Sequence, residues 1–355
     1  MTARIRSDLD RLPAYVPGRT IAGAIKLASN EVAAGPLPSV VEAIAAAATE
    51  VHRYPDSGAG ALLSRLSQRF DVPEDHLSVG CGSVTLCQQL LQATCTHADE
   101  VVFGWRSFEA YPILTQVVGA RSVQVPLTDG YRLDTEAMLA AITPATRLVF
   151  ACTPNNPTGT PLHTDELRAF LDAVPSDVLV VIDEAYREFV ADPDVPDGIE
   201  VARAAWGRGR HNVAVLRTFS KAYGLAGLRV GYCVAPPAVT AAVRKTFVPF
   251  GVSSLAQAAA IASLDAGDEL RARCRQIVAE RSRVRDELRA MGYDVPVSEG
   301  NFVWLPLGER AAEFNEYCLD NKVIVRAFAG DGARVTIGEP DENDTFLAVA
   351  RSFSR

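Results

Sequence analysis

The chain has 355 residues, of which 48% are hydrophobic, so it can bury more than one core and we expect two domains. Its formal net charge of −8 at pH 7 gives no basic surface for nucleic acid and no polybasic cluster for an anionic membrane. The first residues lack the apolar core of a signal peptide, and no apolar run reaches the ~20 residues of a spanning helix, so we expect a cytoplasmic protein.

The first local signal in chain order is a glycine-rich turn, Val79-Gly-Cys-Gly-Ser-Val-Thr-Leu86. We expect the residues after Gly82 to open a helix, with the backbone amides near Ser83 and Val84 pointing outward at its N-terminus, where an anion is favoured. Such a turn can also simply let a strand pass tightly into a helix. It therefore predicts a phosphate site only together with residues further along the chain.

Three apolar runs follow, and each ends in polar residues. The run from Leu148 to Cys152 stops in a Pro- and Asn-rich loop that holds Asn156. The run that starts at Val178 delivers Asp183 and Tyr186, and the run from Val213 to Thr218 delivers Lys221. Segments long enough for crossover helices separate these runs, so we expect a parallel sheet with ligands at the carboxyl ends of its strands.

Lys221 lies in a turn of small residues, which favours a lysine that reacts through its amine. A lysine enclosed there can be desolvated enough to lose its proton and attack an aldehyde, giving a Schiff base. Ser220 and Arg229 would then bind a phosphate, because a guanidinium fork and a hydroxyl both suit phosphate oxygens. The alternative for this segment alone is an ordinary surface turn with a solvated arginine.

The pattern changes after about residue 254. A long helical stretch, from Ser254 to about Met291, is followed by short strands near Phe302–Leu305 and Arg334–Ile337. We expect a smaller α/β domain in this part of the chain. The seven cysteines and five histidines are scattered without ligand spacing, so we expect neither disulfides nor a metal site.

These motifs together resemble those of the fold-type I, pyridoxal-phosphate-dependent aminotransferases of class I/II. The resemblance runs nearly from end to end, in the order Tyr15-Val-Pro-Gly18, Leu27-Ala-Ser-Asn-Glu31, Asn155-Asn-Pro-Thr-Gly159, Asp183-Glu-Ala-Tyr186, Ser220-Lys221 and Arg334-Val-Thr-Ile-Gly338. It implies an α/β fold in which a large domain, residues 29–252, carries a mainly parallel sheet flanked by helices. An N-terminal arm, residues 1–28, joins a small C-terminal α/β domain, residues 253–355.

The resemblance also implies roles around pyridoxal 5'-phosphate. Lys221 would hold the cofactor as a Schiff base and move the substrate proton, and Asp183 would face the pyridine nitrogen. Asn156 and Tyr186 would hydrogen-bond the phenolic oxygen, while Phe108 would stack on the ring. The implied contacts to the phosphate and its surroundings are Gly82, Ser83, Val84, Thr218, Ser220, Arg229 and, from the neighbouring subunit of a homodimer, Tyr54.

For the substrate, the resemblance assigns the α-carboxylate to Arg334, with Asn30 assisting. A bidentate arginine holds a carboxylate in one orientation and so aligns the bond to be broken. Tyr15 and Arg326 match positions that contact the distal group of the substrate. An arginine at 326 suits a phosphate and a carboxylate equally well.

Several departures favour one branch of this family. Val84-Thr85 stands where histidinol-phosphate enzymes commonly carry an acidic pair, and Arg326-Ala-Phe328 stands where they often carry Arg-Pro-Tyr. These changes resemble the bacterial aromatic, or phenylalanine, aminotransferases. We therefore expect an enzyme that moves the amino group of aromatic L-amino acids, namely phenylalanine, tyrosine or tryptophan, to 2-oxoglutarate, giving aromatic 2-oxo acids and L-glutamate.

Three alternatives remain at this point. The first is a histidinol-phosphate aminotransferase, since both substrate types could use one arginine. The second is a pyridoxal-phosphate-dependent decarboxylase of the same fold, because spacing does not show which bond to the α-carbon is broken. The third is a ligand-sensing domain of a transcription regulator, which would need an added DNA-binding module that we do not expect here.

Overall fold

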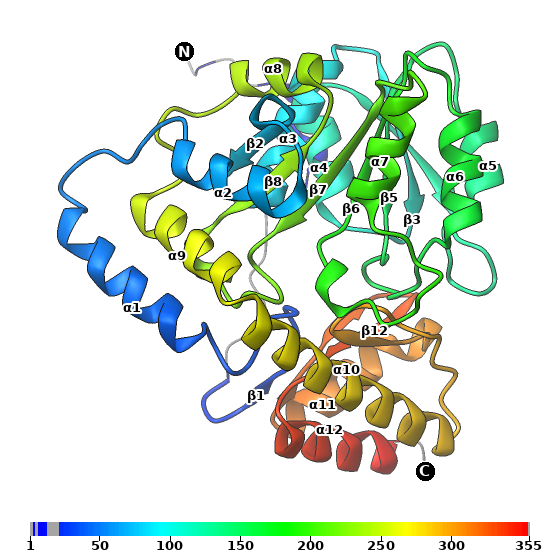
Figure 1. Cartoon of the computed structure of the whole chain (residues 1–355). Helices are drawn as coiled ribbons and strands as arrows, with labels where there is room; N and C mark the ends of the chain where they lie inside the picture. Colours follow the sequence, from blue (N-terminus) through cyan, green and yellow to red (C-terminus); the bar gives the residue numbers. More distant parts are fainter. Residues whose placement is uncertain (1–2, 4–5, 13–20, 354–355) are drawn as a thin grey trace.

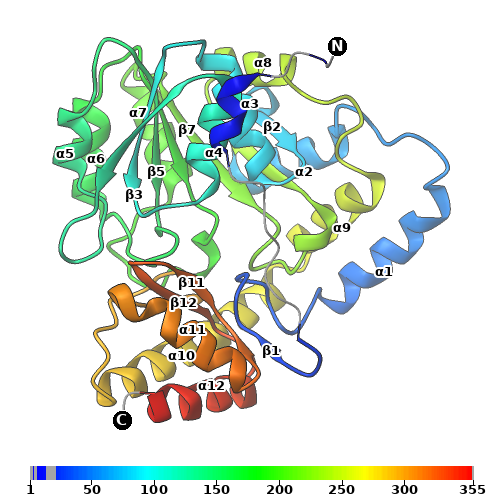
Figure 2. The same cartoon turned by 180° about the vertical axis from the view of Figure 1, so that it is seen from behind.

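The structure is a computed structural model that describes residues 3, 6–12 and 21–353. Figure 1 shows a large unit built on a sheet with helices on both faces, and below it a smaller unit made mostly from the C-terminal part of the chain. In the view from behind, the small β-strands β11 and β12 face the ends of the large unit's strands (Figure 2). A junction between the two units therefore lies next to the strand ends of the sheet.

The large sheet has seven strands in the order β2-β8-β7-β6-β5-β3-β4. Its strands are β2 (Leu77–Gly80), β3 (Glu100–Trp105), β4 (Arg121–Pro126), β5 (Thr146–Cys152), β6 (Leu179–Asp183), β7 (Val213–Thr218) and β8 (Gly231–Val234). Only β8 runs antiparallel to its neighbours in this sheet. The mainly parallel sheet and the three apolar strands predicted from the sequence are confirmed.

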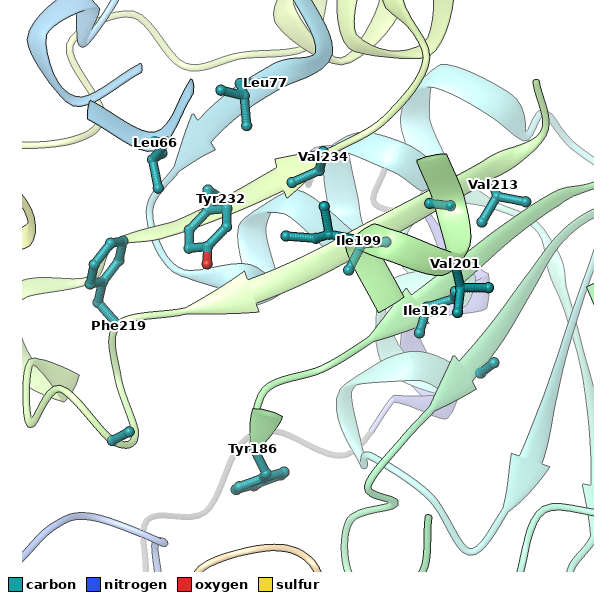
Figure 3. Close-up of a cluster of buried hydrophobic side chains, with 14 of the residues drawn as sticks. Leu66, Leu77, Ile182, Tyr186, Ile199, Val201, Val213, Phe219, Tyr232 and Val234 are labelled. Carbon is teal, nitrogen blue, oxygen red and sulfur yellow. The ribbon is translucent and has the colours of Figure 1, made fainter. Parts of the chain in front are cut away.

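Helices cover both faces of this sheet, which explains why its strands are apolar without alternation. On β6, Val180 and Ile182 point into one hydrophobic cluster, whereas Leu179 and Val181 point into another. The first cluster is shown in Figure 3, where Ile182 lies on β6 and Tyr186 lies beyond the end of that strand. The helices over the first cluster are α2 (Gly60–Phe70), α5 (Thr135–Ala140), α6 (Thr164–Ala173), α7 (Gly198–Gly207) and α9 (Ser254–Asp265), and those over the second are α3 (Ser83–Thr94), α4 (Ala110–Val118) and α8 (Pro237–Lys245).

The smaller unit has its own hydrophobic cluster. An antiparallel sheet of three strands, in the order β11-β12-β9, packs there against helices, and a short N-terminal strand pairs with β10. The elements are β1 (Ile25–Lys26), α10 (Gly267–Ala290), β9 (Phe302–Leu305), α11 (Ala311–Asp320), β10 (Val323–Ile324), β11 (Arg326–Phe328), β12 (Gly332–Thr336) and α12 (Pro340–Phe353). The two short strands expected in this part of the sequence are present.

The helical stretch expected from Ser254 to about Met291 is present, but it is divided in two. The chain forms two helices that meet at Ala266, with α9 ending at Asp265 and α10 beginning at Gly267 (Figure 1). Gly267 is a poor helix former, but the break depends mainly on packing, because α9 buries its side chains in the large unit and the later part of α10 buries its own in the small one. The division between residues 252 and 253 stays a prediction.

One further helix, α1 (Pro38–Ala47), packs along α9 and projects from the large unit (Figure 1). Among the residues that the structure describes, no helix combines the length and apolarity needed to cross a lipid bilayer.

Candidate active site

A cavity of about 930 Å³ lies between the carboxyl ends of β5, β6 and β7, the N-terminus of α3 and the strands of the small unit. This is the edge at which ligands bind in open parallel sheets. The wall brings together most of the predicted residues: Ser83, Val84, Phe108, Asn156, Asp183, Tyr186, Thr218, Ser220, Lys221, Arg229, Arg326 and Arg334.

Lys221 follows β7 and extends its amine into this cavity. Its Nζ donates a hydrogen bond to the backbone carbonyl of Ser29 at 3.0 Å. Burial, together with the positive charge of Arg334, lowers the pKa of Lys221 to about 7. A substantial fraction of this lysine is therefore an uncharged amine at neutral pH, which is the form that can act as a nucleophile or a base.

Asp183 is the last residue of β6 and is almost fully buried. Its Oδ2 accepts a hydrogen bond from the Tyr111 hydroxyl at 2.6 Å, while Oδ1 has no hydrogen-bond partner among the described residues. Burial raises the pKa of Asp183 to about 6. A buried carboxylate oxygen without a donor is costly, so this position favours a ligand that presents a positively charged N–H group.

Two hydrogen-bond donors point into the cavity beside these residues. The Tyr186 hydroxyl accepts a hydrogen bond from Asn30 Nδ2 at 2.9 Å, so its own proton remains to be donated. The side-chain oxygen of Asn156 accepts from Arg334 Nη1 at 2.5 Å, which leaves its amide NH₂ as the donor. The pair is thus arranged to hold one acceptor oxygen of a ligand.

An anion site lies at the N-terminus of α3. The helix is preceded by Gly82, and no side chain of the described residues caps it, so its first amides have no side-chain acceptor. A Cβ atom at Gly82 would lie 2.7 Å from Arg229 Nη2, so only glycine leaves room for the guanidinium there. Ser220 accepts from the Thr218 hydroxyl at 3.0 Å and from Arg229 Nη1 at 3.4 Å. This cluster suits a phosphate group.

Two of the remaining predicted residues lie outside the cavity wall, and a third cannot be placed because it falls outside the described residues. Asn30 is fully buried behind Tyr186, where Thr336 Oγ1 donates to its Oδ1 at 3.0 Å, so it positions Tyr186 and does not line the cavity. Tyr54 is 83% exposed and stacks on Phe250 with ring centroids 4.7 Å apart. Tyr15 lies outside the described residues. The roles of these residues in binding stay predictions.

The structure adds two residues that the sequence reasoning missed. Tyr111 hydrogen-bonds Asp183, and it also contacts the ring of Phe108 edge-on, with centroids 5.5 Å apart. Glu109 pairs with Arg326, with 2.9 Å between Oε2 and Nη2. Both lie in the stretch around Phe108, but their partners come from β6 and β11, so local sequence held no signal for either contact.

Another cavity, of about 890 Å³, lies between α2, α7 and the junction of α9 with α10. Its central guanidinium, Arg217, is almost fully buried and pairs with Glu184 at 2.7 Å and with Asp197 at 2.8 Å. At its rim, Arg203 pairs with Asp71 at 3.0 Å. Arg217 is thus paired with Glu184 and Asp197, and Arg203 with Asp71.

The fold and the first cavity combine a mainly parallel α/β sheet with a buried lysine, a buried carboxylate and a helix N-terminus beside an arginine, all at the strand ends. A model of the family "Aminotransferase class I and II" matches residues 22–349, and the chain belongs to that family. The aminotransferase predicted from the sequence is thereby confirmed.

Within this family the chain is 57% identical to an aromatic amino acid aminotransferase of Rhodococcus jostii (strain RHA1), over 99% of this chain and 96% of the relative. It is also 57% identical to an aromatic amino acid aminotransferase of Streptomyces coelicolor, over 99% and 98%. A crystal structure of histidinol-phosphate aminotransferase from Sinorhizobium meliloti in complex with pyridoxal-5'-phosphate superposes with a TM-score of 0.89 at 30% identity, covering 99% of both chains.

Proposed function

We propose that this aminotransferase moves the amino group of aromatic L-amino acids to 2-oxoglutarate, giving aromatic 2-oxo acids and L-glutamate, with pyridoxal 5'-phosphate as cofactor. The observation that carries the proposal is the convergence of Lys221, Asp183 and Arg334 on one cavity that also presents apolar side chains to a substrate. Those apolar side chains are Ile113, Leu319, Val325 and Phe328, and they lie beside the ion pair of Glu109 with Arg326. The relatives named aromatic amino acid aminotransferase support the same substrate class.

The described residues fit this cofactor. The unpartnered Oδ1 of Asp183 suits a protonated ring nitrogen, and the donors of Tyr186 and Asn156 suit the phenolic oxygen. The α3 N-terminus and Arg229 suit the phosphate. When bound, pyridoxal 5'-phosphate supplies the aldehyde that carries the amino group and a ring that accepts electrons.

The residues of this chain then divide the work at the substrate. Arg334 is held by Asn156 and by the carbonyl of Ala28 at 2.5 Å, and its guanidinium is oriented to clamp an α-carboxylate. The uncharged amine of Lys221 takes the proton from the α-carbon of the amino donor. In the second half-reaction the same group returns a proton to the α-carbon of the 2-oxo acid acceptor. The apolar side chains of the cavity would shield an aromatic substrate side chain from water during these steps.

We also propose a homodimer. Tyr54, Phe250, Val51 and Val248 are 83%, 44%, 59% and 61% exposed, and Tyr54 stacks directly on Phe250. Exposed apolar side chains that gather in this way mark a protein interface. Light scattering of the purified protein should give twice the chain mass, and a monomer that is fully active would remove the proposed role of Tyr54.

The seven free cysteines, six of them buried, support a cytoplasmic location, where thiols stay reduced.

The substrate class is tested with cofactor-loaded protein in single-turnover assays. Phenylalanine, glutamate and histidinol phosphate are mixed separately with the protein, and conversion of the bound cofactor is followed by absorbance. We expect fast conversion by phenylalanine and glutamate and slow conversion by histidinol phosphate. The reverse order would assign the protein to histidinol phosphate, and release of carbon dioxide would indicate a decarboxylase.

A further inference from the structure

The mouth of the active-site cavity carries an ion pair that joins the two units of the molecule. Glu109 lies immediately before α4 in the large unit, and Arg326 begins β11 in the small unit. Their side chains are 42% and 37% exposed, and both line the cavity. The pair is therefore accessible to solvent and to the distal end of a substrate.

The other cationic groups of the cavity already have tasks. Arg334 lies deeper, against Asn156, and Arg229 lies at the anion site of α3. Among the described residues of the cavity wall, Arg326 is the cation left for a distal group, and its Nη2 donates a hydrogen bond to Glu109 Oε2 at 2.9 Å. A distal anion must therefore compete with Glu109 for Arg326 and also tolerate the negative charge of Glu109 nearby.

We propose that Glu109 is a specificity-determining residue, which neutralises Arg326 for uncharged aromatic side chains and selects against distal groups of high negative charge. The inference rests on the proposed function and refines its substrate class. An aromatic side chain meets a neutral ion pair instead of an isolated cation. A single distal carboxylate can displace Glu109 from Arg326, whereas a doubly charged phosphate meets about twice the repulsion.

Binding of unreactive ligands to the cofactor-loaded protein tests this independently of turnover. The probes are 3-phenylpropionate, glutarate and 3-phosphonopropionate, which share a carboxylate and differ in the charge of the distal group. We expect Glu109→Gln to tighten glutarate about fivefold and 3-phosphonopropionate about 25-fold, since the electrostatic free energy scales with the distal charge. Binding of 3-phenylpropionate should change less than about twofold.

Two control variants separate charge from structure. Glu109→Asp keeps the charge and should keep the ligand preference of the unchanged protein. Asp331→Asn breaks a matched pair, Arg106 with Asp331 at 2.5 Å, which also joins the two units but lies outside the cavity wall. We expect it to change the three affinities equally.

Two outcomes would overturn the inference. One is a Glu109→Gln protein whose three affinities keep their original ratios, and the other is the same shift in ratio from Asp331→Asn. The proposed function is tested separately by turnover of phenylalanine with 2-oxoglutarate. If that turnover fails while the ligand ratios shift as expected, the role of Glu109 stands and the substrate assignment does not.

Discussion

Two cavities among the described residues have nearly equal volumes, about 930 and 890 Å³, but differ in how their charged groups are paired. In the active-site cavity, Asp183 keeps an oxygen without a partner among the described residues, and Lys221 reaches only a backbone carbonyl. In the other cavity, Arg217 is saturated by Glu184 and Asp197. Volume therefore does not identify a functional site here, whereas charged groups left for a ligand to complete do.

The largest expected effect comes from the amine of the active-site cavity. Lys221→Ala should lower the turnover of phenylalanine with 2-oxoglutarate by at least about 10⁴-fold, because the nucleophile and the base are removed together. Steady-state assays measure the loss, and circular dichroism checks that the fold persists. Lys221→Arg should fail equally, since a guanidinium stays protonated. A fully active alanine variant would contradict the assignment.

The next effect concerns the unpartnered carboxylate. Asp183→Asn should lower turnover by about 10²–10³-fold, because a neutral amide does not keep a ring nitrogen protonated. Tyr111→Phe removes one hydrogen bond to Asp183 and should cost about tenfold. Both are measured as kcat with saturating substrate. Equal losses from the two changes would mean that the contact with Tyr111, and not the charge, carries the role of Asp183.

Changes to the ion pairs of Arg217, in the other cavity, should act on stability. Glu184→Gln leaves the buried guanidinium of Arg217 with Asp197 as its remaining carboxylate, and should cost about 3 kcal/mol of unfolding free energy. Urea denaturation measures the loss. The turnover of the protein that remains folded should stay within about twofold, since Glu184 lies outside the active-site wall. A large fall in kcat with unchanged stability would break the contrast between the two cavities.

The smallest expected effect is a change in stability that depends on pH. Burial raises the pKa of Glu188, in the wall of the second cavity, to about 7. Between about pH 4.5 and 7 the folded state therefore binds more protons than the unfolded state, so this group lowers stability as pH rises through that window. A shift from 4.5 to about 7 corresponds to at most about 3.4 kcal/mol at pH 8. Because Glu188 is only partly buried, we expect Glu188→Gln to be more stable than the unchanged protein by about 1–2 kcal/mol at pH 8 and close to it at pH 4.5. Thermal unfolding at the two pH values measures the difference, and a constant difference would contradict it.

Much of the fold and of the site could be predicted because their signals are local. The runs that became β5, β6 and β7 are apolar on both faces, and this pattern requires a covered sheet. Asp183 ends β6, and Asn156 and Lys221 come shortly after β5 and β7, so parallel pairing alone brings the three to one edge. The helix break at Ala266 could not be predicted in this way, because it follows from which unit each helix packs against.

The sequence by itself determined which chemical groups stand at the strand ends and hence the family. Only the tertiary structure decided how those groups are held. Tyr111 reaches Asp183 across 72 residues of chain, Asn30 reaches Tyr186 across 156, and Glu109 reaches Arg326 across 217. Such contacts leave no periodic or local pattern, because they depend on the packing of whole units, and it is this packing that fixes the protonation, orientation and charge of the groups named by the motifs.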